Sequence, residues 1–383
     1  MTLCERCSRA HFTADVRWQT SIAKACPTLL SLKVYLRCSQ QSCTMANQGN
    51  NQMTSRRGFL TAVGLASLAA ATHTFAQKQT RSIPRIGVLW HAGSAEEEKV
   101  PLSALRQGLK DLGYIEGKNI LLENRYPAEQ PERFQSYAIE LAKLEVDVLL
   151  AVTRPAALAA QRATSSIPIV FVVVPDPVGS KIVSNLAKPG GNITGLSTMA
   201  VELTAKRIEL LKETVRGMSR VGLLVNMNDP EGARRYIEVA LTAAALLKVT
   251  VQPVEVRAAR DFEGAFASMS QQKLQGVVST QDGLFYVESR RMAALALKHR
   301  LPLITFVKEA VEAGALLSYG PSSAAIFRRA GIFVDKILKG TKPGDLPVEL
   351  PMQFELFVND QTARTIGVQV APSVKLRADK VID

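Results

Sequence analysis

Arg154 and Asp282 are the residues of this 383-residue chain whose types and sequence surroundings most clearly suggest binding of charged groups. In Thr153-Arg154-Pro155-Ala156, a proline suited to the first turn of a helix follows a guanidinium. Free backbone N–H groups at a helix start bind anions, and Arg154 adds a positive charge. Asp282, in Gln281-Asp282, follows an apolar run and would suit a cation. The residues of these two segments, Thr153 to Ala156 and Gln281 to Asp282, are therefore predicted to bind a zwitterion, unless Arg154 is an ordinary surface residue and Asp282 only a helix cap.

Four further candidates follow other predicted strands. Trp90 and His91 come after the run 85–89, and His91 is either a ligand contact or a loop residue. Asp176, between two prolines, either caps the next helix or faces a cleft. Asn226 ends the run 220–226. We therefore add all four to the predicted ligand-binding residues.

The sequence offers no complete catalytic, metal or cofactor site. Beyond residue 76 it has no cysteine, no G-x-S-x-G nucleophile motif and no histidine other than His91 and His299. It also lacks the glycine spacings of dinucleotide- and nucleotide-binding loops. The sequence thus predicts a binding protein without catalytic residues, metal or cofactor.

An internal repeat predicts the elements that position these residues. Each unit reads strand, helix, strand, strand, helix, strand, and its two copies are offset by about 130 to 135 residues, as in duplicated architectures. The first copy comprises residues 85–90, 102–112, 119–123, 146–150, 155–164 and 167–172; the second comprises 220–226, 231–247, 250–254, 276–279, 288–299 and 301–306.

Continuous Val/Ile/Leu strands alternating with helices are typical of parallel sheets covered on both faces. The fold class is therefore α/β, with two doubly wound parallel-sheet lobes. Ligands of open parallel sheets bind beyond the carboxyl ends of the strands, so we expect the site in the cleft between the lobes.

The N-terminal region predicts export. Ser55-Arg56-Arg57-Gly58-Phe59-Leu60 begins a basic, then apolar, then small-residue pattern that ends near Ala76 and is typical of a twin-arginine signal peptide over residues 45–76. The alternative, a membrane-spanning helix, needs roughly 20 apolar residues, and this run is shorter. The mature protein is expected in the periplasm, with no membrane insertion after cleavage.

Residues 1–44 precede the position where a signal should begin, and Met45 or Met53 is a suitable start. All five cysteines lie there, and Cys4-x-x-Cys7 lacks the second pair of a metal site. We interpret 1–44 as a non-native extension. Without residues 1–76, 39 Lys/Arg and 32 Asp/Glu remain, a net charge of +7 that is interspersed along the chain. This pattern argues against nucleic-acid binding.

Several motifs, in order, resemble one group of ABC-transporter substrate-binding proteins with the type I periplasmic-binding-protein fold, which includes tryptophan- and tyrosine-type import components. They are Asp176–Ser180, Lys188–Ser197, Glu202–Lys212, Leu317–Gly320, Arg328-Arg329, Val334–Gly340, Leu346–Glu349 and Phe354–Leu356. The resemblance extends over residues 84–383.

This resemblance implies two lobes joined by three crossovers: 84–197 with 320–340, and 198–319 with 350–383. It implies a monomer that captures a small molecule, an amino acid or a related carboxylate, and delivers it to an ABC permease. Asp282 matches the acidic position of the family, in keeping with an ammonium-binding role. An extracytoplasmic sensor for a signalling partner is the alternative, and an enzyme on this fold is not expected.

Overall fold

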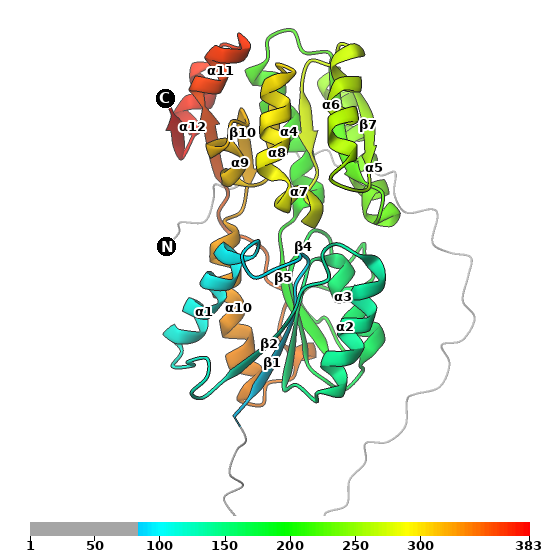
Figure 1. The fold of residues 1–383 in the computed structure, drawn as a ribbon, viewed down its shortest axis with the longest axis vertical. Helices are drawn as coiled ribbons and strands as arrows, with labels where there is room; N and C mark the ends of the chain where they lie inside the picture. Colours follow the sequence, from blue (N-terminus) through cyan, green and yellow to red (C-terminus); the bar gives the residue numbers. More distant parts are fainter. Residues whose placement is uncertain (1–82) are drawn as a thin grey trace, which may run out of the picture. The chain divides into compact units, whose positions relative to one another are not determined.

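The structure is a computed structural model that describes residues 83–383. The predicted extension 1–44 and signal peptide 45–76 lie outside this range. The described part contains two β-sheets, each covered by helices on both faces, as Figure 1 shows. The predicted two-lobed α/β class is confirmed.

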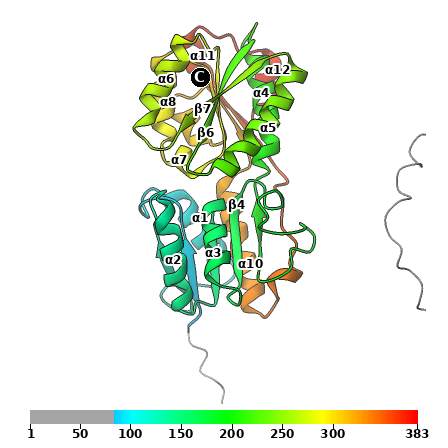
Figure 2. The same cartoon turned by 90° about the vertical axis from the view of Figure 1, so that its right-hand side faces the viewer.

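The first sheet is wholly parallel, with the strand order β2-β1-β3-β4-β5. Its strands are β1 (Arg85–Leu89), β2 (Leu121–Arg125), β3 (Val148–Val152), β4 (Ile169–Val174) and β5 (Ile193–Ser197). Helices α1 (Lys99–Asp111) and α10 (Ser323–Leu338) pack on one face, and α2 (Pro131–Lys143) and α3 (Arg154–Ala163) on the other (Figure 2). Every residue of β3 is buried, as a strand covered on both faces requires.

Helix α10 reaches this sheet although it follows the second lobe in sequence. It lies against α1 so closely that a Cβ on Gly331 would be 2.9 Å from the backbone of Gly108. Glycine at these two positions therefore allows the close approach of the helices.

The second sheet has the order β12-β11-β10-β9-β8-β6-β7. Its strands are β6 (Arg220–Asn226), β7 (Thr250–Val256), β8 (Val277–Ser279), β9 (Leu303–Thr305), β10 (Leu317–Gly320), β11 (Glu355–Asn359) and β12 (Lys380–Ile382). Helices α4 (Ala200–Thr214), α5 (Pro230–Leu247), α11 (Asp360–Ile366) and α12 (Pro372–Arg377) cover one face; α6 (Asp261–Gln271), α7 (Gly283–Val287), α8 (Ser289–Lys298) and α9 (Lys308–Glu312) cover the other.

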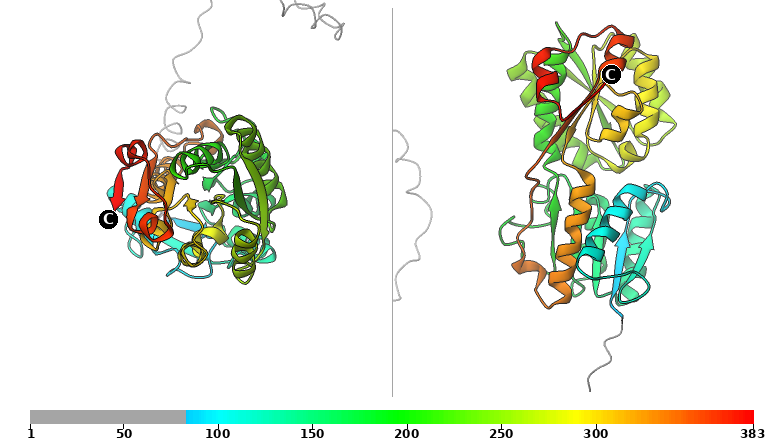
Figure 3. Two further views of the ribbon diagram at one scale, coloured as in Figure 1. Left: turned by 90° about the horizontal axis from the view of Figure 1, so that it is seen from above. Right: turned by 90° about the vertical axis from the view of Figure 1, so that its left-hand side faces the viewer.

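This second sheet is mixed rather than wholly parallel, which corrects the prediction. Strand β11 pairs antiparallel with β10, and β12 runs parallel to β11. The reason lies in the path of the chain: β10 leaves this sheet toward the first lobe, and β11 enters from that lobe at the same end (Figure 3). The chain thus passes between the sheets at 198–199, 321–322 and 350–354.

We call residues 83–197 with 321–349 the first lobe, and 198–320 with 350–383 the second lobe. Within the range 83–383, no helix combines the length and the apolar character that a membrane span requires.

Candidate functional site

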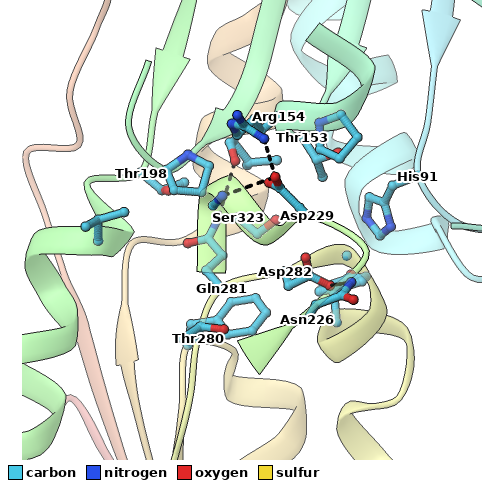
Figure 4. Close-up of a pocket in the computed structure, with 18 of the residues that line it drawn as sticks. His91, Thr153, Arg154, Thr198, Asn226, Asp229, Thr280, Gln281, Asp282 and Ser323 are labelled. Carbon is cyan, nitrogen blue, oxygen red and sulfur yellow. Dashed lines mark hydrogen bonds and ion pairs between the residues drawn. The ribbon is translucent and has the colours of Figure 1, made fainter. Parts of the chain in front are cut away.

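An open cavity lined by residues of both lobes holds about 1030 Å³ of empty space, a value that includes open solvent (Figure 4). It lies where strands of the two sheets end, as the sequence predicted. Seven of the ten predicted ligand-binding residues line it: His91, Thr153, Arg154, Pro155, Asn226, Gln281 and Asp282. Trp90, Ala156 and Asp176 do not.

Trp90 was predicted to contact the ligand and instead belongs to the core of the first lobe. It is fully buried, stacks with both Tyr126 and Phe327, and its Nε1 donates a hydrogen bond to Asn124 Oδ1 at 2.8 Å. The two-residue alternation of a strand explains this position, because Ile86 and Val88 lie in the same core cluster as Trp90.

Ala156 and Asp176 have structural positions as well. Ala156 is fully buried on the inner face of α3. Asp176 Oδ1 accepts a hydrogen bond from the backbone N–H of Gly179 at 2.8 Å, residues 177–181 form a turn, and β5 follows before the next helix begins at Ala200. Asp176 therefore closes a turn and caps no helix, and its other carboxylate oxygen faces Arg235 of the second lobe at 3.8 Å.

Arg154 lies at the cleft with most of its side chain buried, which excludes an ordinary surface position. Its side chain is 12% exposed and forms an ion pair with Asp229 of the second lobe. Its Nε donates a hydrogen bond to Ser180 Oγ of its own lobe at 3.1 Å. The guanidinium therefore bridges the two lobes, and its charge is already matched by a carboxylate.

Helix α3 begins from a strained residue. Thr153 has φ = +79°, a backbone conformation that favours glycine, and its side chain makes no capping hydrogen bond. Strained residues that the surrounding structure holds in place are frequent at ligand sites. The N–H groups at the start of α3 consequently have no side-chain acceptor from Thr153.

Arg235 makes the reciprocal contact from the second lobe. It donates hydrogen bonds to Ser180 Oγ, at 3.2 Å, and to the carbonyl of Gly179, and its Nε lies 3.8 Å from Asp176 Oδ2. Arg154 and Arg235 thus come from opposite lobes and meet at Ser180. We call Arg154, Ser180, Asp229 and Arg235 the arginine clasp.

Asp282 caps a helix and also lies at the cavity. As N-cap of α7, its Oδ1 accepts hydrogen bonds from the Leu284 N–H at 2.9 Å and from Asn226 Nδ2 at 2.8 Å. It also lines the cavity. Burial, reinforced by the charge of Glu129, raises the pKa of Asp282 to about 7.

His91 is 5% exposed and lies between two carboxylates. Its Nε2 is 3.2 Å from Glu98 Oε1 and its Nδ1 is 2.9 Å from Glu129 Oε1. Burial alone would lower the pKa of His91, but the charges of Glu98, Glu129 and Asp282 outweigh burial and raise it to about 9. His91 is therefore an imidazolium at neutral pH, and Tyr286 of the second lobe meets its ring edge-on at 5.7 Å.

Several lining residues were not among those predicted from the sequence; they include Glu129, Thr198, Tyr236, Tyr286 and Phe306. Three of them could have been found by inspecting every strand end. Glu129 lies in the loop after β2, Thr198 directly follows β5 and Phe306 directly follows β9. Tyr236 and Tyr286 lie within α5 and α7, where no sequence motif distinguishes them from core aromatics.

Among residues 83–383, no group of three or more His, Cys, Asp or Glu side chains is arranged to hold a metal ion. The polar groups of the cavity are instead suited to hydrogen bonds and ion pairs with an organic molecule.

Comparison with known proteins identifies a family for this chain. A model of the family described as ABC transporter substrate binding protein matches residues 94–382. A tyrosine-binding protein of Clostridioides difficile (strain R20291) is 27% identical over 278 residues, which make up 72% of this chain and 77% of the relative.

Two solved structures are also similar. A conserved domain protein from Vibrio cholerae has a TM-score of 0.74 and 26% identity, and the match covers 78% of this chain and 100% of that one. An ABC domain in complex with L-Trp from Streptococcus pneumoniae has a TM-score of 0.69 and 22% identity, with the same coverage.

Proposed function

The chain belongs to the family of ABC transporter substrate-binding proteins, and we propose that it captures a small molecule between its lobes and delivers it to a membrane permease. The main support is the cavity, whose polar side chains come from both lobes. A ligand that contacts both lobes favours their closed arrangement, because it binds that arrangement more tightly.

An amino acid or a related carboxylate is the proposed ligand. The start of α3, with Arg154, would receive the anionic end, and Asp282 the cationic end. The similarity to a tyrosine-binding protein supports an amino acid. The ion pair with Asp229 means that Arg154 would contact the ligand only by sharing its guanidinium between two carboxylates.

The proposal extends to the setting in which the protein works. We propose an exported, periplasmic monomer without catalytic activity, in keeping with the twin-arginine pattern of residues 55–60 and with a family of binding proteins. Its macromolecular partners would be the permease subunits of an ABC importer.

The proposal is tested by native mass spectrometry of residues 77–383 purified from the producing cells, followed by calorimetry with the twenty amino acids. We expect a one-to-one complex with one retained or added small molecule. A transport role further requires that deleting the partner permease abolish uptake of that molecule. If the protein retains no molecule and binds none of the tested amino acids, that result would count against the proposed function.

A further inference from the structure

The cationic side chains that line the cavity already have carboxylate partners. Each lies within 3.8 Å of one, in the pairs His91–Glu129, Arg154–Asp229 and Arg235–Asp176. Asp282 differs, because its contacts are the neutral amide of Asn226 and the backbone N–H of Leu284. Among the described residues that line the cavity, Asp282 is thus a carboxylate without a cationic side chain in contact.

Glu129 of the first lobe brings a second carboxylate to the same place. A methyl group added at Gly283, the residue after Asp282, would overlap Glu129 Oε1 and would lie 2.8 Å from His91 Nδ1. The backbone N–H of Glu129 donates to the His91 carbonyl at 2.9 Å, which fixes the loop in this position. The Glu129 side chain therefore reaches across the cleft to the start of α7.

Carboxyl groups outnumber basic side chains around this contact. His91 supplies one positive charge, and Glu98, Glu129 and Asp282 are the carboxylates whose charges act on it. The nearest aromatic group, Tyr286, is neutral, and Asp229 adds a further negative charge to the field at Asp282. Closing the lobes thus brings like charges together, and a cation placed between them would relieve the repulsion.

An independent observation indicates that a polar ligand belongs in this cavity. Thr198 lines the cavity and is 2% exposed, yet its Oγ1 has no hydrogen-bond partner within the protein. Buried hydroxyls are almost always hydrogen-bonded, so such a group points to a partner supplied by the ligand.

We propose that Glu129 and Asp282, one from each lobe, jointly bind the protonated amino group of the ligand. This inference rests on the proposed function and narrows it: the ligand is an organic amine, and a carboxylate without an amino group is a poor ligand. Glu129 is then a specificity-determining residue, and closure is coupled to the charge of the ligand.

Three molecules that share a 4-hydroxyphenyl group but differ in their amino and carboxylate groups test this inference: L-tyrosine, tyramine and 3-(4-hydroxyphenyl)propionate. Their binding is measured by calorimetry on residues 77–383. If another amino acid binds more tightly in the calorimetric panel, that amino acid is used instead, together with the amine that lacks its carboxylate and the acid that lacks its amino group. We expect the deaminated acid to bind about tenfold more weakly than the amino acid, or worse. Equal binding of the two overturns this inference and leaves the proposed function intact. Failure of the whole panel overturns both.

The Glu129→Gln variant tests the assigned residue, because it keeps the size of the side chain and removes its charge. We expect it to weaken amino-acid binding about tenfold and to leave binding of the deaminated acid unchanged or improved. Glu132→Gln, an exposed acid in the first turn of α2, is the matched control and should change neither. An equal effect of Glu129→Gln on both molecules would identify a purely structural role and overturn the inference.

Discussion

The guanidinium of Arg154, at the start of α3, forms an ion pair with Asp229, the N-cap of α5, across the cleft between the lobes. Asp229 Oδ1 also accepts a hydrogen bond from the backbone N–H of Gly232 at 3.1 Å. The Asp229 carboxylate therefore caps a helix of the second lobe and also binds the Arg154 side chain at the start of a helix of the first lobe. Because the two side chains are only 12% and 18% exposed, solvent weakens this ion pair less than a surface pair.

The first prediction concerns the arginine clasp. Arg154→Ala should weaken ligand binding about 30-fold, roughly 2 kcal/mol, because it leaves Asp229 and the ligand poorly paired in the closed cleft. The variant should also show a larger radius of gyration than the wild type at equal ligand saturation. Calorimetry and small-angle X-ray scattering measure the two effects.

Arg162→Ala is the control, since Arg162 lies on the same helix and contacts Gln135 within the first lobe. A double-mutant cycle of Arg154→Ala with Asp229→Asn should give a coupling energy of about 1–3 kcal/mol. Additive effects of these two substitutions would mean that the ion pair contributes nothing to closure.

The second prediction concerns His91 and pH. The folded-state pKa of about 9 exceeds the usual 6.5, so the folded protein binds an extra proton between these values. The resulting stabilisation is complete below about pH 6.5 and is lost as the pH rises through 9, a change on the order of 3 kcal/mol. Urea unfolding from pH 6 to 9 should therefore show a steeper loss of stability in the wild type than in His91→Gln.

The slope is the informative quantity, because His91→Gln also leaves Glu98 buried without its partner. The raised pKa of Asp282 has the same sign but acts at lower pH, between about 4 and 7. It therefore overlaps little with the window above pH 7. Parallel pH profiles of the two proteins above pH 7 would show that His91 is not protonated as described.

Sequence patterns predicted the strands well because hydrophobic burial determines them. β3 and β6 lie within two residues of their predicted ranges, since both are continuous apolar runs in a sheet core. The direction of β11 could not be read from its residues. It depends on a crossover from the other lobe, which is a tertiary feature.

The site was predictable to the extent that it follows strand ends. His91, Arg154 and Asp282 were identified in this way, and Glu129 and Thr198 obey the same rule. The pairing of Arg154 was not predictable, because Asp229 is 75 residues away and meets it only when the two lobes face each other. Alternation along β1 would have assigned Trp90 to the core.

The third prediction concerns export. Replacing Arg56 and Arg57 by Lys should leave precursor in the cytoplasm, because the twin-arginine signal is read by a receptor and not merely as charge. Cell fractionation with an antibody to the mature protein measures this effect. Equal export of the variant and the wild type would instead favour the general secretory route.

The fourth prediction concerns Gly283. Both groups that a Cβ at this position would meet, from Glu129 and His91, belong to the other lobe. Gly283→Ala should therefore hinder closure and weaken ligand binding, while the melting temperature without ligand stays near that of the wild type. Gly264→Ala, in α6, is the control: its Cβ would have no neighbour within 4 Å, and alanine favours a helix by roughly 1 kcal/mol. A Gly283→Ala variant that binds and closes normally would mean that Glu129 moves aside easily.

The fifth prediction compares two buried threonines, one whose hydroxyl has no hydrogen-bond partner within the protein and one whose hydroxyl has such a partner. The Thr198 hydroxyl lines the cavity without a partner, whereas the Thr204 hydroxyl, within α4, donates to the Ala200 carbonyl at 3.0 Å. Replacing a hydroxyl by a methyl group nearly preserves shape, so Thr198→Val should leave stability without ligand unchanged or higher and should weaken ligand binding. Thr204→Val should lower stability by about 1 kcal/mol and leave affinity unchanged. Thermal melting and calorimetry on both variants measure this contrast, and wild-type affinity in Thr198→Val would show that its hydroxyl does not contact the ligand.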